Sequence, residues 1–175
     1  STKLLLDEIK KLNKAPKKFI TSSAVGIYGN TNDQEITTNS LAGKGFLADV
    51  CKEWEENLLE HNIEGMKAHA LRTGIVLSDD GGALTKMLPP FKLGVGGKLG
   101  SGKQYMSWIH RDDLVSAFIF IMNNDCKDFA YNGVAPSPVT NIEFTKVLGK
   151  VLNRPTISPV PGFVLKLIFG EMSEI

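Results

Sequence analysis

The chain has 175 residues, of which 42% are hydrophobic and 22% are charged, and its formal net charge at pH 7 is +1. This composition indicates a folded globular domain with a sizeable core. It excludes the polarity of a disordered chain and the basic excess of a nucleic-acid-binding protein. The longest apolar runs are far shorter than the roughly 20 residues needed to span a bilayer, so no membrane partner is predicted.

Two cysteines, Cys51 and Cys126, lie far apart and belong to no Cys-x-x-Cys motif or Cys/His cluster. Neither a disulfide framework nor a metal site is therefore predicted, and a reducing compartment, the cytoplasm, is expected. The chain opens at Ser1 inside a helical pattern, which we interpret as the start of a fragment or of a processed product.

Hydrophobic spacing and turn residues predict helices that alternate with strands. The clearest helix covers residues 46–61, where apolar side chains such as Leu47, Cys51 and Trp54 recur every three or four positions. Before and just after this helix, the sequence predicts a helix over 1–14, a strand from 17 to 23, a loop over 30–45 and two β-like runs within 66–78. The middle of the chain predicts a helix from 83 to 89, a glycine-rich stretch over 94–102 and an extended segment over 105–110. The last part predicts a helix over 111–124, a strand over 129–135, a helix over 140–153 and an apolar helix over 161–172. This alternation favours an α/β fold with a parallel, helix-covered sheet.

Single residues sharpen several of these predictions. Thr140 and Glu143 have the spacing of a capping box at the start of a helix. Pro89 lacks a backbone donor and is expected to end the helix that contains it. Trp54 and Trp108 lie in apolar patterns, so both are predicted to be core residues.

A glycine-rich loop imitates a phosphate-binding P-loop, G-x-x-x-x-G-K-[ST]. Gly97, Gly102 and Lys103 fit the pattern, but Gln104 stands where a hydroxyl is required. A P-loop also needs a buried strand before it and a helix that starts at the lysine, and neither is predicted here. The alternatives are a mobile glycine loop and a substrate-cleft loop with Lys103 and Gln104 near a polar ligand. A P-loop NTPase is the least favoured hypothesis.

The segment "TSSAVGIYG" places hydroxyl groups at the end of a predicted strand, where open α/β sheets bind ligands. A serine there can hydrogen-bond a carbonyl or hydroxyl that is being reduced or oxidised, and a nearby tyrosine can transfer a proton. Ser23 and Tyr28 are the candidates. The alternative is a serine-rich strand end that satisfies its own backbone. His110, three residues before Asp113, is interpreted as a structural histidine at the start of a helix.

Several segments in unbroken order resemble one family. They are "FITSSAVGIYGN", "FLADVCKEWE", "LRTGIVLSDDGGALTKMLPPFKLGVGGKLGSGKQYMSWIHRDDLVSAF", "NGVAPSPVTNIEFTKVLGKVLNRP" and "GEM". Together they are similar to the epimerase-like branch of the atypical extended short-chain dehydrogenases/reductases, proteins described as NAD-dependent epimerase/dehydratase or sugar-nucleotide epimerase-like. The similarity runs over nearly all of the chain.

The resemblance implies a Rossmann-like doubly wound parallel sheet that binds NADP or NAD, with a smaller substrate-binding region expected over 82–110 and 135–175. In this family a glycine fingerprint precedes the helix that opens this chain, and a helical segment follows the "GEM" motif. The resemblance therefore implies that the chain lacks both ends. Such a chain is expected to bind dinucleotide poorly by itself, because the pyrophosphate site lies in the absent part.

The residue patterns above and the resemblance together give a small set of candidate site residues. The resemblance itself carries over the strand end at Thr21, Ser22 and Ser23, the segment Gly74, Ile75 and Val76, and the motif that contains His110. The candidates are Ser23 and Tyr28 at the reaction centre, Thr21, Ser22, Gly74, Ile75 and Val76 on the cofactor side, and Lys103, Gln104 and His110 on the substrate side.

Two departures from the family pattern bear on activity. Extended enzymes of this superfamily use a Tyr-x-x-x-Lys pair on the helix after the serine strand. Here Phe46 or Leu47 stands for the tyrosine, and Val50 or Cys51 stands for the lysine. Classical nucleotide-sugar epimerases also place an arginine where this chain has Met106.

Two functional hypotheses follow from this resemblance. The first is an NAD(P)-dependent oxidoreductase or epimerase-like enzyme that acts on a small carbonyl or hydroxyl substrate, with Tyr28 or Lys52 in place of the missing pair. The second is an NAD(P)-binding regulatory or scaffold protein that has lost catalysis.

Overall fold

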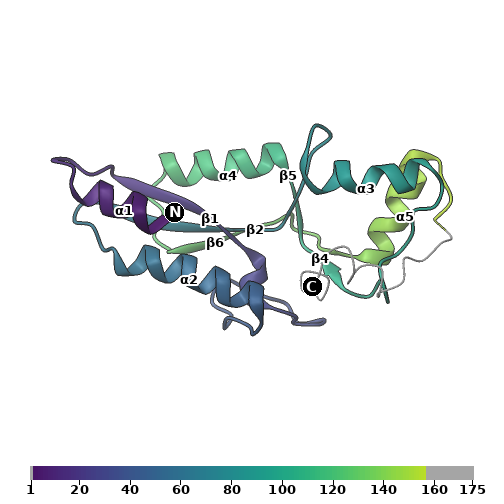
Figure 1. The fold of residues 1–175 in the computed structure, drawn as a ribbon, viewed down its shortest axis with the longest axis horizontal. Helices are drawn as coiled ribbons and strands as arrows, with labels where there is room; N and C mark the ends of the chain where they lie inside the picture. The colour runs from purple at the N-terminus through teal and green to yellow at the C-terminus, as the bar shows by residue number, and fades with distance from the viewer. Residues whose placement is uncertain (1, 157–175) are drawn as a thin grey trace. The chain divides into compact units, whose positions relative to one another are not determined.

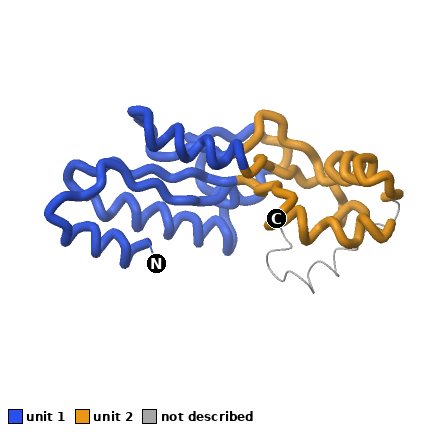
Figure 2. The backbone as a smooth tube through the Cα atoms, turned by 90° about the horizontal axis from the view of Figure 1, so that it is seen from above, with its two compact units in different colours: residues 1–31, 35–73, 112–133 blue, residues 32–34, 74–111, 134–175 orange. Residues whose placement is uncertain are grey.

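The computed structural model describes residues 2–156 (Figure 1). The chain divides into two compact units, which Figure 2 colours separately. Unit 1 comprises residues 1–31, 35–73 and 112–133, and unit 2 comprises residues 32–34, 74–111 and 134–175. The helix predicted over 161–172 lies outside the described residues. Within them, no helix has the length and apolar character needed to cross a membrane.

Unit 1 is a three-stranded parallel sheet with helices on both faces (Figure 1). The strands, in spatial order, are β1 (Lys18–Ala24), β2 (Lys67–Thr73) and β6 (Ala130–Gly133). Helices α1 (Thr2–Lys10) and α2 (Phe46–Glu60) cover one face, α4 (Arg111–Asn123) covers the other, and the 3-10 helix η1 (Val25–Tyr28) follows β1. The predicted Rossmann-like α/β fold is confirmed.

Side-chain alternation along β2 builds the two apolar layers of unit 1. Ala70 packs with Leu6 of α1 and Leu58 of α2. Its neighbour Leu71 points to the opposite face and packs with Ile121 of α4. Successive residues of a strand face opposite sides, so an apolar run in a central strand supplies both layers.

Helix α2 occupies the predicted residues but buries a different face. Trp54 is 44% exposed, so its prediction as a core residue is wrong. The buried positions of the helix are Ala48, Cys51, Glu55 and Leu58. The buried stripe therefore contains a carboxylate, and a charged side chain is placed in a core only when it has a partner there.

The described part of unit 2, which ends at residue 156, contains two small sheets and two helices. In the first sheet, β3 (Ile75–Leu77) pairs in parallel with β5 (Trp108–His110). In the second sheet, β4 (Tyr105–Met106) pairs antiparallel with β7 (Val139–Thr140). The two helices are α3 (Gly82–Lys92) and α5 (Asn141–Leu152). Trp108, predicted to be buried, is only partly so, and its indole N–H donates to the Ser137 carbonyl oxygen at 3.2 Å.

The predicted end of a helix at Pro89 is wrong, because α3 continues through Pro89 and Pro90 to Lys92. A proline removes one helical hydrogen bond but has a φ close to that of a helix. The buried Phe91 holds the following turn in place, and the amide of Leu93 donates to the Pro89 carbonyl oxygen at 3.1 Å.

Helix α5 begins with the predicted capping box. The Thr140 hydroxyl accepts from the Glu143 amide at 3.3 Å, and the Glu143 carboxylate accepts from the Thr140 amide at 2.7 Å. This second hydrogen bond is the main cause that lowers the pKa of Glu143 below its ordinary value.

The glycine-rich loop of unit 2 is a fixed turn rather than a P-loop. Lys103 and Gln104 lead directly into strand β4, so no helix begins at the lysine. The Gly102 amide donates to the Leu99 carbonyl oxygen at 2.9 Å. The buried Asn141 side chain accepts from the Leu99 amide at 2.7 Å. Backbone and side-chain contacts therefore fix the loop, which argues against the mobile alternative.

Two glycines of this loop make a matched test of its packing. Gly102 and Gly100 both have positive φ, at 72° and 54°, but a Cβ on Gly102 would lie 2.5 Å from Ile142 Cγ1, whereas a Cβ on Gly100 would have no neighbour within 4 Å. We expect Gly100→Ala to cost about 1 kcal/mol of unfolding free energy because of its backbone conformation. Gly102→Ala is expected to cost roughly 1–3 kcal/mol more.

Urea unfolding followed by Trp108 fluorescence in a Trp54→Phe background measures both losses. Equal losses for the two variants would contradict the close packing of Gly102 against α5.

Candidate functional site

The carboxyl end of the sheet in unit 1 gathers polar side chains from all three strands. Open parallel sheets bind ligands at this end. The register places Ser23 beside Arg72, Ala24 beside Thr73, and Arg72 beside Asn132. Because neighbouring residues of a strand face opposite sides, these groups divide into two sets.

The set on the α4 side consists of two hydroxyls. Ser22 Oγ lies 3.2 Å from Thr73 Oγ1, and Ser22 is exposed. Thr73 donates its own hydrogen to the Leu71 carbonyl oxygen at 3.1 Å, so it acts as the acceptor in this pair. The Ser22 oxygen keeps acceptor capacity toward solvent and can receive a hydrogen bond from a ligand.

The set on the α2 side is built around a buried ion pair. Arg72 of β2 donates from Nε to Glu55 Oε1 at 2.9 Å and from Nη2 to Glu55 Oε2 at 2.8 Å, and both side chains are buried. This two-pronged geometry is the strongest form of a carboxylate–guanidinium contact. The hydrogen bonds with Glu55 raise the pKa of Arg72 above its ordinary value, so the side chain stays cationic.

Both predicted reaction-centre residues bind to this ion pair. Ser23 Oγ donates to Glu55 Oε1 at 2.7 Å, and Arg72 Nη1 donates to the Tyr28 hydroxyl at 2.8 Å. Tyr28 in turn donates to Asn132 Oδ1 at 2.7 Å. Ser23 is only 3% exposed and Tyr28 only 6%. We call these five residues the Arg72 network. In it, the hydrogens of both hydroxyls are given to protein acceptors.

Helix α2 presents Leu47, Cys51 and Glu55 toward β1 and η1. Leu47 Cβ lies 3.5 Å from where a Cβ on Gly26 would be. Burial is the largest cause that raises the pKa of the Cys51 thiol, so this thiol stays neutral near pH 7. The position expected for a lysine in this family therefore holds an uncharged group.

The contacts of Lys52 are made with residues outside the Arg72 network. Its ammonium pairs with Asp49 at 2.6 Å and donates to the Gly43 carbonyl oxygen at 3.4 Å. The hypothesis that Lys52 replaces the missing lysine gains no support from these contacts.

The remaining predicted site residues lie in unit 2, whereas Thr21 and Ser22 lie in unit 1. A Cβ on Gly74 would lie 2.5 Å from the Ser107 carbonyl oxygen, which itself accepts from the Ile75 amide at 2.7 Å. Gly74 is therefore required for the backbone approach that joins β3 to the segment before β5.

The substrate-side candidates of unit 2 differ in exposure. His110 ends β5 opposite Leu77 of β3 and is exposed. Lys103 is also exposed, whereas the Gln104 side chain donates to the Leu99 carbonyl oxygen at 3.1 Å and so stabilises its own loop. The cofactor-side and substrate-side roles of these residues stay predictions.

Sequence reasoning missed Glu55, Arg72 and Asn132. One signal was present for Arg72, because a single charge within the apolar strand "AHALRT" requires a buried partner. The partner could have been sought one turn after Cys51, on the face of the predicted helix that carries apolar residues. Asn132 gave no such signal.

No protein-family model matches the chain. The chain is 44% identical over 160 residues to "Epimerase family protein SDR39U1 homolog, chloroplastic" of Arabidopsis thaliana, covering 91% of this chain and 46% of that protein. It is 41% identical over 158 residues to "Epimerase family protein ML0860" of Mycobacterium leprae, covering 90% of this chain and 52% of that protein.

A solved structure of similar fold completes the comparison. The crystal structure of human epimerase family protein SDR39U1 (isoform2) with NADPH matches with a TM-score of 0.91 and 32% identity, covering 98% of this chain and 59% of that chain. The chain is a member of the epimerase-like family of extended short-chain dehydrogenases/reductases. It spans about half the length of the curated relatives of this epimerase-like family, 46% and 52% in the two cases above.

The buried ion pair predicts a large difference between two adjacent glutamates of α2. Glu55→Ala leaves the Arg72 cation buried without a counter-charge and is expected to cost about 3–5 kcal/mol of unfolding free energy. Glu56→Ala, at the exposed neighbouring position, is expected to change it by less than about 0.5 kcal/mol. Urea unfolding of both variants measures the difference. Similar small losses of unfolding free energy would show that the ion pair does not stabilise the fold.

Proposed function

We propose that the protein containing these residues binds NADP or NAD and acts as an oxidoreductase or epimerase-like enzyme on a small carbonyl or hydroxyl substrate. One observation carries the proposal: the match at a TM-score of 0.91 and 32% identity to a family member whose structure holds NADPH. Because the chain spans 59% of that structure, the proposal concerns the whole protein.

The residues at the carboxyl end of the sheet fit a cofactor of this kind. The open hydroxyl of Ser22, supported by Thr73, suits the amide and ribose hydroxyl groups of a nicotinamide nucleoside, which offer both donors and acceptors. When bound, the nicotinamide would supply the hydride chemistry. Ser22 and Thr73 would orient it against the strand ends.

Tyr28 is the proposed acid/base, with Arg72 in the role that a lysine has elsewhere in the superfamily. Arg72 Nη1 donates to the Tyr28 hydroxyl oxygen at 2.8 Å. A cationic donor at this oxygen stabilises the negative charge that develops there when the hydroxyl gives up its proton. Ser23, through Glu55, would hold the opposite end of the same guanidinium.

A second candidate function, cofactor binding without turnover, is favoured by the burial of the same residues. Ser23 and Tyr28 donate to Glu55 and Asn132 rather than to an open site. A substrate would have to replace the Asn132 contact to receive the Tyr28 proton. The two candidates share the cofactor and differ in turnover.

The cofactor proposal predicts a thermal shift. Saturating NADPH or NADH is expected to raise the melting temperature of the full-length protein, since ligand at about 100 times its dissociation constant adds about 2.7 kcal/mol of stability. Ser22→Ala is expected to weaken binding about fivefold, the value of one neutral hydrogen bond. Ser116→Ala, which removes an exposed hydroxyl on α4, is the matched control. No shift with either dinucleotide would refute cofactor binding.

The two candidates are separated by turnover on a panel of small carbonyl substrates with the preferred dinucleotide. If Tyr28 is the acid/base, Tyr28→Phe lowers turnover by about 10²–10⁴ and leaves dinucleotide affinity unchanged. Tyr105→Phe, at an exposed tyrosine of β4, is expected to change neither. A wild-type protein that binds dinucleotide but turns over no substrate would support the second candidate instead.

A further inference from the structure

The Arg72 network makes one contact that the function proposed above does not use. Arg72 Nη1 donates to the Thr38 carbonyl oxygen at 3.0 Å as well as to the Tyr28 hydroxyl at 2.8 Å. This nitrogen carries two hydrogens, so both are taken. Thr38 lies within residues 35–43, a loop of unit 1 that precedes α2. We call residues 35–43 the Thr38 loop.

Two further contacts place the Thr38 loop against Tyr28. The Ile36 side chain packs on the buried cluster that contains Tyr28 and Cys51. The Gly43 amide donates to the Ile27 carbonyl oxygen at 2.8 Å, and a Cβ on Gly43 would lie only 2.2 Å from the Tyr28 carbonyl oxygen. The loop therefore contributes to the burial of Tyr28, which is only 6% exposed.

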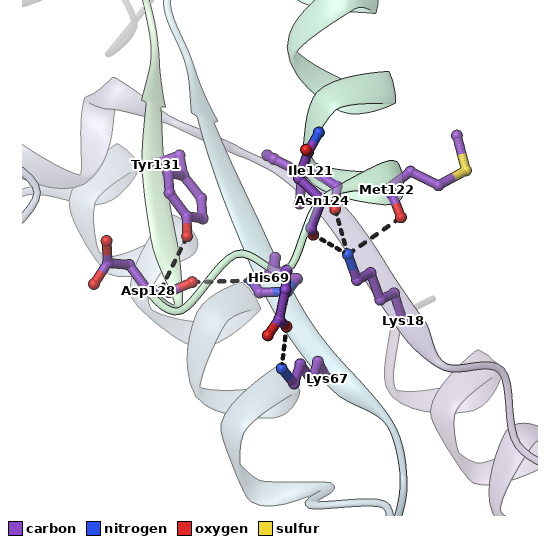
Figure 3. Close-up of polar contacts among 9 residues, drawn as sticks. Lys18, Lys67, His69, Ile121, Met122, Asn124, Asp128 and Tyr131 are labelled. Carbon is purple, nitrogen blue, oxygen red and sulfur yellow. Dashed lines mark hydrogen bonds and ion pairs between the residues drawn. The ribbon is translucent and has the colours of Figure 1, made fainter.

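A lysine at the opposite, amino end of the sheet shows a different kind of contact with carbonyl oxygens. Lys18 donates to the carbonyl oxygens of Ile121 at 2.7 Å and Met122 at 3.2 Å, in the last turn of α4 (Figure 3). A helix leaves its last carbonyls without partners, and a cation beside them is stabilising. The Thr38 carbonyl belongs to a loop instead, so it can leave Arg72 without breaking a helix or a strand.

The Thr38 oxygen is the same chemical group as the one on which the proposed reaction acts. A small carbonyl substrate presents an oxygen that accepts hydrogen bonds, as a backbone carbonyl oxygen does. In the place of the Thr38 oxygen, it would accept from Arg72 Nη1 beside the Tyr28 hydroxyl, which accepts from the same nitrogen. A cationic donor there would stabilise negative charge that develops on the substrate oxygen.

We propose that the Thr38 loop is autoinhibitory: its carbonyl oxygen occupies the position of the substrate carbonyl oxygen, and the loop must withdraw from Arg72 before substrate binds. The inference rests on the function proposed above and states how its site is controlled. It also explains why the proposed acid/base is buried, because the described conformation is the closed one. A site that is open in only a fraction of the molecules binds substrate more weakly by that fraction. Release of the loop therefore lowers KM.

Gly43→Ala in the full-length protein tests the proposal, because its Cβ would overlap backbone atoms of Tyr28 and Gly29 and displace the loop. Cys51 reports the displacement, since Ile36 packs on its cluster. We expect alkylation of Cys51 to become about tenfold faster, whereas Cys126, in another cluster, keeps its rate. With NADPH and p-nitrobenzaldehyde as the probe, KM is expected to fall about tenfold at unchanged kcat.

Gly65→Ala is the matched control. It strains the backbone at a φ of 76°, but its Cβ would have no neighbour within 4 Å. A variant that merely loses stability in this way should change neither KM nor the alkylation of Cys51.

The outcomes separate the control by Thr38 from the proposed function. Turnover by both proteins with equal KM, or an unchanged alkylation rate of Cys51, would overturn the autoinhibition and leave the enzyme proposal standing. No reduction of p-nitrobenzaldehyde by either protein would count against both. Turnover by Gly43→Ala alone would support both. If Gly43→Ala does not fold, Ile36→Ala, which removes an anchor of the loop without a clash, is expected to lower KM in the same way, and an unchanged KM decides against the proposal.

Discussion

The two-pronged ion pair between Arg72 and Glu55 sets the geometry of the carboxyl end of the sheet. A buried guanidinium needs a buried counter-charge, so α2 must turn Glu55 toward β2. With Glu55 facing inward, Trp54, one residue earlier in the helix, faces solvent. Ser23 and Tyr28 then take their orientation from the two charged groups. One electrostatic requirement thus accounts for the rotation of a helix and for the placement of both candidate catalytic hydroxyls.

The order and type of the elements could be predicted because they depend on local patterns. The spacing of apolar residues located α2, and the capping box located the start of α5, each to within a residue. The face of α2 could not be read in the same way, since the partner of Glu55 is a strand residue 17 positions later. The prediction that α3 ends at Pro89 was wrong for a related reason. Pro89 is a local signal for a helix end, and the packing of Phe91 outweighs that signal.

At the candidate site, sequence reasoning located the strand end but not the side toward which each hydroxyl points. A strand reverses its facing with every residue, so adjacent serines have opposite surroundings. Ser22 opens to solvent beside Thr73, whereas Ser23 is held by Glu55. The family resemblance pointed to this strand end, and the hypothesis placed Ser23 at the reaction centre; of the two serines, Ser22 has the accessible hydroxyl. The two serines differ in their surroundings because Ser22 lies beside Thr73 of β2 and Ser23 lies beside Glu55 of α2.

The uncharged Val50 and Cys51 of α2, where the family pattern has a lysine, and the Arg72 network have one physical explanation. Cys51 lies close enough to Glu55 and Arg72 for both charges to act on its thiol, although burial is the larger influence that raises its pKa. A lysine at this position would place a second cation beside the guanidinium, and the two would compete for one buried carboxylate. An uncharged side chain there leaves Glu55 entirely to Arg72. The cation that contacts Tyr28, one turn after β1, is therefore carried by strand β2, whereas helix α2 supplies its counter-charge Glu55.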